Sequence, residues 1–79
     1  MKFSLLGPDL KNSYEILWLE VETSLGNFVI QDGHAPLLLI LKPNQEIIFS
    51  FYDGTIEKQM IPGGILEITR SDATLLLNE

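Results

Sequence analysis

The chain's only histidine, His34, is the residue that most invites a search for chemistry. Asp32 lies two positions before it and serines occur elsewhere, so a Ser-His-Asp hydrolase is one hypothesis. However, no serine lies in a strained Gly-x-Ser-x-Gly turn, and side chains at i and i+2 of an extended chain do not by themselves orient an imidazole. We therefore expect His34 to be a structural or interface residue.

Other kinds of chemical site have less support. One histidine without cysteine cannot supply a zinc site, and the acidic residues lack the spacing of a calcium loop. Gly63-Gly64 is not followed by the Lys-Ser/Thr of a phosphate-binding loop, so we expect a kink between strands there. No pair of carboxylates is marked out for glycoside chemistry, and the acids are expected to form a solvated face. We expect no cofactor and no metal.

Length and composition limit the class of protein. The 79 residues predict one domain, 1–79, with a single small core. The net charge is −6 and the five basic residues are scattered, so nucleic acid is not an expected partner. No apolar run approaches the roughly 20 residues of a spanning helix, which argues against direct membrane insertion. The absence of cysteine suits a reducing compartment.

The segment Gly33-His34-Ala35-Pro36 is predicted to be a shaped corner. Glycine permits a positive φ, while Pro36 fixes its own φ and favours an extended Ala35. Five apolar residues follow at 37–41, and a run without a polar face predicts burial on both sides, in the core and also under a partner. The 46% content of hydrophobic residues, high for so small an interior, also points to a protein partner.

Alternating apolar residues and turn residues predict an all-β chain. The expected strands are 1–6, 15–22, 28–30, 37–41, 47–52, 55–61, 65–69 and 73–77, with a bend or short edge strand at 10–14. In the segment 15–22 we expect Leu17, Leu19 and Val21 to face the core. Asp53-Gly54 predicts a type I′ hairpin. Breaks at intervals of about eight to twelve residues predict an antiparallel sandwich or flattened barrel.

Three stretches together resemble the N-terminal domain of the epsilon subunit of F-type ATP synthases, called delta in mitochondria. They are Gly33-His34-Ala35-Pro36-Leu37-Leu38 with Leu41-Lys42-Pro43, then Gly63-Gly64-Ile65-Leu66-Glu67-Ile68, and finally Ala73-Thr74-Leu75-Leu76-Leu77. The first stretch is highly specific to the family and the second supports it. The likeness spans nearly the whole chain.

This resemblance implies a flattened antiparallel β-sandwich or barrel of about ten short strands. It also implies a non-catalytic subunit of the rotor's central stalk, which holds the gamma subunit against the ring of membrane c subunits. The residues carried over to the gamma side are Gly33, His34, Ala35, Pro36 and Leu37. Those carried over to the c-ring side are Gly26, Asn27, Phe28, Gln31 and Asp32.

The sequence departs from the family in two places. Gly26-Asn27-Phe28-Val29 replaces the usual Gly-Glu-Leu/Phe-Gly, which removes one charge-assisted contact to the ring. The sequence ends at Glu79, so we expect the fold without the family's C-terminal helical hairpin, and a subunit that couples without inhibiting if this is the natural end. A start at Met1 without a transit peptide predicts a bacterial or organelle-encoded protein, on the cytoplasmic face of a bacterial inner membrane.

A second hypothesis stays open. The same scaffold could be a stand-alone β-sandwich module that binds a protein, peptide or sugar ligand, as the altered loop at Asn27 allows. An exposed aromatic groove around Trp18 and Tyr52, without an apolar patch near His34, would favour this function.

Overall fold

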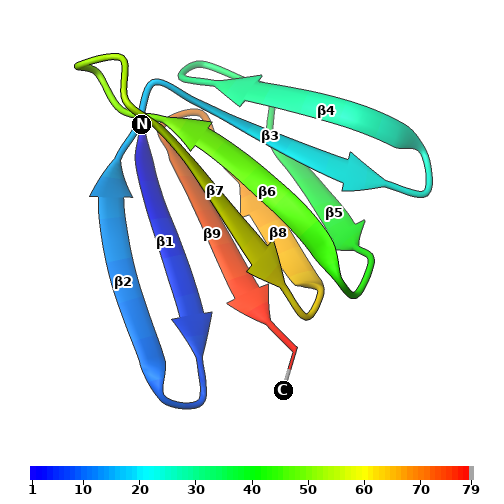
Figure 1. Cartoon of the computed structure of the whole chain (residues 1–79). Coiled ribbons are helices and arrows are strands. Elements are labelled where there is room, and N and C mark those ends of the chain that lie inside the picture. Colours follow the sequence, from blue (N-terminus) through cyan, green and yellow to red (C-terminus); the bar gives the residue numbers. More distant parts are fainter. Residues whose placement is uncertain (79) are drawn as a thin grey trace.

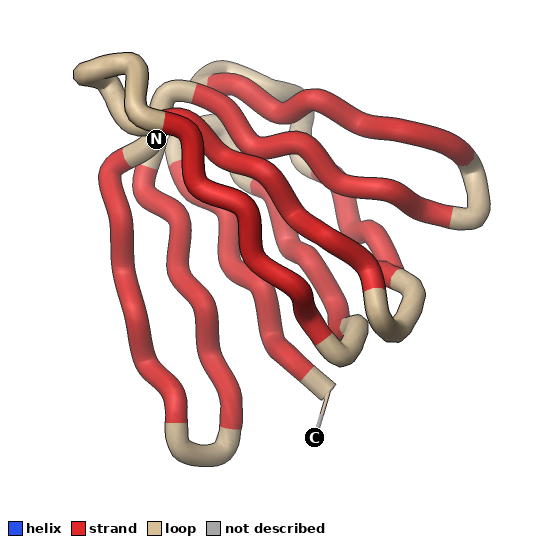
Figure 2. The backbone as a smooth tube through the Cα atoms, in the orientation of Figure 1, coloured by secondary structure: helices blue, strands red, loops and turns tan. Residues whose placement is uncertain are grey.

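The computed structural model describes residues 1–78, and every regular element in that range is a β-strand (Figure 1; Figure 2). None of these residues belongs to a helix long and apolar enough to cross a membrane. The nine strands are β1 (Lys2–Gly7), β2 (Leu10–Glu15), β3 (Trp18–Thr23), β4 (Gly26–Gln31), β5 (Leu37–Leu41), β6 (Gln45–Ser50), β7 (Ile56–Ile61), β8 (Gly64–Ile68) and β9 (Asp72–Leu77).

The strands form one strongly curled sheet in the order β2-β1-β9-β8-β5-β3-β6-β7, and β4 pairs with β3 at its side (Figure 1). The prediction of an all-β sandwich or barrel is confirmed, with nine strands in the described residues instead of about ten. One pairing is not antiparallel, because β1 runs parallel to β9. Side-chain alternation in the sequence is the same for both strand directions, so it could not reveal this pairing.

The concave side of the sheet holds the core. Alternate side chains of nearly every strand meet there, because successive residues of a strand point to opposite faces. The Phe3 and Phe49 rings meet edge to face with centroids 5.2 Å apart, and Tyr14 packs 5.4 Å from Phe49. The buried hydrophobic residues are Met1, Phe3, Leu5, Ile16, Leu19, Val21, Ile30, Leu39, Leu41, Ile47, Phe49, Ile61, Leu66, Ile68, Ala73 and Leu75.

The prediction that Leu17 faces the core is wrong. Leu17 is exposed and Ile16 is fully buried instead. The predicted strand 15–22 is interrupted, since β2 ends at Glu15 and β3 begins at Trp18. The N–H groups of Ile16 and Leu17 donate to the carbonyls of Met1 and Ser50, so the two residues form a corner and the alternation starts afresh after it.

The segment 37–41 was predicted to be buried on both sides, in the core and under a partner, and within this chain only the core side is buried. Leu39 and Leu41 are buried, whereas Leu38 and Ile40 are exposed on the convex face. A run of five apolar residues therefore marks a strand with one face in the core and one apolar face left uncovered.

The hairpin at Asp53-Gly54 exists, but its turn is not type I′. Strands β6 and β7 pair antiparallel, and the connection runs from Phe51 to Thr55. Only Gly54 has a positive φ there, of 90°, whereas a type I′ turn needs two. The longer loop is closed by the Phe51 N–H donating to the Thr55 carbonyl at 2.9 Å.

The predicted kink at Gly63-Gly64 lies between β7 and β8. Gly63 has a φ of 93°, and Gly64 packs directly against the backbone of Leu76 on β9. No side chain fits between these two strands, so glycine is required for β8 and β9 to pair at this end.

Candidate partner-binding surface

The corner after β4, residues 33–36, is an exposed elbow. Gly33 adopts a φ of 84° and its N–H donates to the Arg70 carbonyl at 2.7 Å, which ties the elbow to the loop between β8 and β9. Gly33, Ala35 and Pro36 are exposed, while Leu37 is half-buried against the core. The elbow is therefore anchored to its own domain at both ends and free to contact another protein along its outer side.

The ring of His34 has a structural partner within the elbow. Its Nδ1 lies 2.8 Å from the Ala35 carbonyl oxygen, and since a carbonyl only accepts, Nδ1 carries the proton. The His34 N–H also donates to the Gln31 carbonyl at 3.1 Å. These contacts hold the half-buried imidazole in place and leave Nε2 available to a partner.

The residues carried over to the ring side lie on β4 and its two ends. Gly26 and Asn27 follow the β3–β4 turn and are exposed, and Phe28 is half-buried against the core. Gln31 and Asp32 are exposed at the other end of β4. The structure therefore does not bring these five residues into one cluster, because an extended strand separates the two groups.

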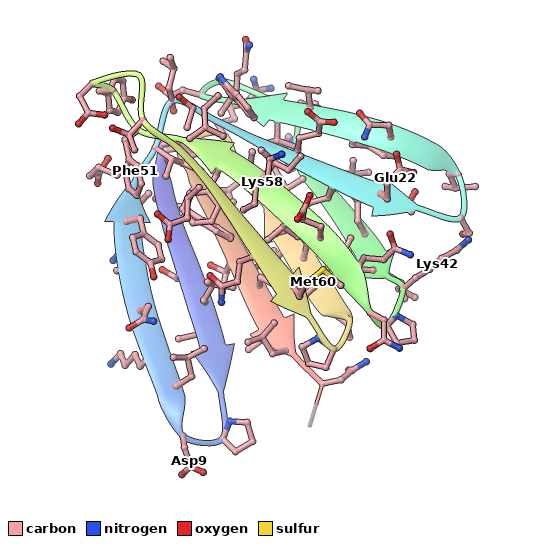
Figure 3. All side chains as sticks on the ribbon, in the orientation of Figure 1. Asp9, Glu22, Lys42, Phe51, Lys58 and Met60 are labelled. Carbon is pink, nitrogen blue, oxygen red and sulfur yellow. The ribbon has the colours of Figure 1, made fainter. Side chains whose placement is uncertain are left out.

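Asn27 sits between two carboxylates. Its Nδ2 donates to Glu20 Oε2 at 3.1 Å and to Glu22 Oε1 at 2.9 Å, both on the neighbouring β3 (Figure 3 labels Glu22). Each oxygen accepts one of the two amide protons, which offsets the repulsion between the glutamates. The Asn27 side chain thus organises two acids on the adjacent strand.

The ends of the two predicted sites meet in one shallow depression. It is lined by Val29, Gln31, Asp32, Gly33 and His34. Gly33 and His34 are predicted gamma contacts, and Gln31 and Asp32 are predicted ring contacts. The two predicted surfaces are therefore continuous along the chain and in space.

The structure also reveals a surface that the sequence reading did not identify residue by residue. On the convex side of the sheet, neighbouring strands β5, β8, β9 and β1 carry one row of apolar side chains. Leu38 lies on the same face of β5, two residues before Ile40. We call this set the apolar face: Leu6, Leu38, Ile40, Ile65 and Leu76.

An apolar groove borders this face. Leu25 and Ile40 are 83% and 74% exposed, and with Leu38 they line a groove between the β3–β4 turn and β5. Contiguous exposed apolar surface of this kind is uncommon on a monomer and marks an interaction site. The continuous apolar run at 37–41 was the available signal, but the register that aligns β5 with β8 and β9 was not readable from the sequence.

A comparison with known protein families agrees with the all-β fold described above. A profile of the family described as "ATP synthase, Delta/Epsilon chain, beta-sandwich domain" matches residues 4–79. This match confirms the resemblance that the sequence motifs indicated.

Two solved structures illustrate the fold. A chain in the structure of the Euglena gracilis mitochondrial ATP synthase, containing OSCP, F1 and the c-ring, has a TM-score of 0.88 at 16% identity over 98% of this chain. A chain in the central stalk and c-ring structure of the Tetrahymena thermophila mitochondrial ATP synthase has a TM-score of 0.82 at 14% identity over 99% of this chain. The present chain spans 49% and 63% of those chains.

Proposed function

Because the chain belongs to the delta/epsilon β-sandwich family of ATP synthases, we propose that it is a subunit of the central stalk of a rotary ATP synthase. In this role it links the gamma subunit to the c-ring, so that rotation of the ring is transmitted without slip. The chain carries out no reaction itself. A close-packed β core suits this task because it transmits strain instead of absorbing it.

The observation that carries the proposal is the apolar face beside the elbow. Leu38 is the second residue after the elbow, and Ile40 and Ile65 continue the apolar surface across β5 and β8. Water contact with these side chains is unfavourable, and covering them contributes about 25 cal/mol per Å² of apolar area. We assign the gamma contact to the elbow and to Leu37 directly after it, together with this face.

The ring contact is assigned to the ends of β4. Gly26, Asn27 and Phe28 lie at one end, and Gln31 and Asp32 lie at the other. The glutamates that Asn27 holds together give this side a negative potential, which favours a partner loop with basic residues.

A stand-alone binding module is the alternative function, and two observations weigh against it. The apolar surface near the elbow is the feature that we expected such a module to lack. Trp18 is half-buried and so offers little exposed aromatic surface, and although Tyr52 is 61% exposed, its hydroxyl accepts a hydrogen bond from the Met1 amine at 3.0 Å within the same domain.

The proposed function implies a general localisation, and the sequence predicts a more specific one. A stalk subunit lies peripheral to the membrane as part of the complex. The finer localisation, the cytoplasmic face of a bacterial inner membrane, stays a prediction, since both solved structures come from mitochondria. Membrane fractions that retain this chain only while the complex is intact would support a peripheral position.

The test is reconstitution with the gamma subunit encoded in the same genome. Equimolar mixtures at micromolar concentration are expected to co-elute as one complex in size-exclusion chromatography. A chain that elutes alone, while its circular dichroism shows an intact β fold, would contradict the proposed function. Adding c-ring in detergent should then shift the binary complex to a larger one.

A further inference from the structure

The sheet leaves several strand edges without a partner among residues 1–78. Strands β2 and β7 end the main order, and β4 pairs with β3 alone (Figure 1). Strand β5 meets β3 only where Leu41 lies opposite Thr23. An open edge presents backbone N–H and C=O groups that can pair with another chain, and natural proteins usually protect such edges with charges or proline.

Two of these edges carry that protection. Strand β2 contains Lys11 and Glu15, and strand β7 contains Glu57 and Lys58 and is followed by Pro62 (Figure 3 labels Lys58).

Strand β4 differs. Its sequence, Gly26-Asn27-Phe28-Val29-Ile30-Gln31, has no charged residue and no proline, and it is open along its full length on one side. Strand β5 is also uncharged, but its open part is shorter and emerges directly from the elbow. Strand β4 is thus the longest unprotected edge of the sheet.

We infer that β4 is completed by an extended segment of the gamma subunit, which adds a strand to the sheet along this edge. The inference rests on the proposed function. Strand β4 connects the two surfaces assigned above, since one end leads into the elbow and the other begins at the β3–β4 turn. A gamma segment that leaves the elbow and follows β4 would join the two contacts through main-chain hydrogen bonds.

The charges around β4 define the chemistry of this segment. Glu20 and Glu22 lie opposite Val29 and Asn27 on β3, and Asp32 follows β4 directly. The segment is therefore apolar or neutral where it passes Val29, and it carries lysine or arginine at its flanks.

A second copy of this chain fits the edge poorly. Pairing two β4 strands would bring the carboxylates of both copies together, in molecules that each carry a net charge of −6. Like charges placed across an interface disfavour that pairing. A basic-flanked segment of another subunit meets no such repulsion.

The experiment combines hydrogen exchange with a matched pair of variants in the complex with gamma. Backbone amides of residues 27–30 are expected to exchange at least about tenfold more slowly in the complex than in the free chain. Val29→Lys places a charge on this edge, and Ile56→Lys does the same on β7. The two side chains are 50% and 56% exposed, so both variants are expected to fold.

Val29→Lys should weaken gamma binding by about tenfold or more, whereas Ile56→Lys should change it less than about twofold. Val29→Thr, which keeps the β-branched shape and adds no charge, should weaken binding much less than Val29→Lys, because the backbone makes most of the contact. Gamma binding without slower exchange at β4, or equal losses for both lysine variants, would overturn the inference and leave the proposed function standing. Absence of gamma binding would contradict both the inference about β4 and the proposed function.

Two further outcomes point to other occupants. Slower exchange at Leu38 and Ile40 with unchanged β4 would place the added strand on β5 and overturn the inference. A concentration-dependent dimer of the free chain that protects β4 would identify a second copy as the occupant and overturn it as well.

Discussion

The α-carbon of Gly64 lies so close to the carbonyl group of Leu76 that a single methyl group on Gly64 would overlap it. The two residues belong to adjacent strands, β8 and β9, where the chain returns from the kink after β7. The contact makes glycine at this position a condition for pairing the last two strands.

Gly64→Ala should therefore destabilise the fold by about 3 kcal/mol, because the methyl group can be placed only by shifting one strand from the other. Gly7→Ala is the control, since a methyl group there meets its neighbours at 3.6 Å or more, an ordinary contact. Urea denaturation followed by circular dichroism measures both. Equal stability of the two variants would contradict the close approach.

The apolar face predicts a selective loss of gamma binding. Leu38→Asp should weaken the complex by more than about tenfold, because it places a charge in a surface that the partner desolvates. Met60→Asp on β7 is the matched control, since Leu38 and Met60 are 63% and 62% exposed (Figure 3 labels Met60). Isothermal titration calorimetry compares them, and similar losses would remove the apolar face from the interface.

Asn27 predicts an electrostatic effect that depends on salt. Asn27→Glu would place a third carboxylate beside Glu20 and Glu22. We expect a loss of about 1 kcal/mol in stability at low ionic strength, which shrinks in 1 M salt because these exposed charges are screened. Thermal denaturation at the two salt concentrations tests it, and a loss that does not depend on salt would contradict the mechanism.

The hydrogen bond from the Met1 amine predicts that the Tyr52 hydroxyl contributes to the stability of the fold. The amine donates to the Ile16 carbonyl and to the Tyr52 hydroxyl, each at 3.0 Å, and so ties the start of β1 to the β6–β7 loop. Tyr52→Phe should cost about 1 kcal/mol of unfolding free energy, since it removes an acceptor of a charged donor. Tyr14→Phe keeps the aromatic packing and should be nearly neutral. If Tyr52→Phe and Tyr14→Phe lower the unfolding free energy equally in urea denaturation, the hydrogen bond between Met1 and Tyr52 does not stabilise the fold.

The loop after β6 predicts a measurable pKa. The Thr55 N–H donates to Asp53 Oδ1 at 2.9 Å, and this backbone hydrogen bond lowers the pKa of the Asp53 carboxyl below its ordinary value of 3.8. Hydrogen bonding to the ionised form stabilises that form. The contribution to stability is complete above pH 3.8 and is lost as the pH falls through the lowered pKa. Carbon-13 NMR titration should show a midpoint below 3.8, and Thr55→Pro, which lacks the donor, should raise it.

The fold class was accessible from the sequence because strands and turns leave local signals. The strands ending at Ile61 and Leu77 were predicted nearly to their bounds, since each is closed by glycine, proline or a polar turn. The corner at Ile16-Leu17 was missed because its two apolar residues continue the local alternation, and only hydrogen bonds to distant strands set it apart.

Part of the candidate partner-binding surface could also be predicted from local signals in the sequence. The elbow could be located from Gly33 and Pro36, whose backbone preferences are local. The row that joins Ile40 to Ile65 and Leu76 depends on the register of three strands far apart in the chain. That register is decided by the packing of the whole core, which no local pattern encodes.

The parallel pairing of β1 with β9 affects how the protein can be made. On the ribosome, residues 2–6 emerge well before their partners at 72–76, with nearly all of this domain in between. A nascent chain must therefore keep Phe3 and Leu5 from aggregating until residues 72–76 have left the exit tunnel. Such dependence on distant segments slows folding, so we expect this domain to fold as a unit once residues 72–76 are available, instead of strand by strand as it is synthesised.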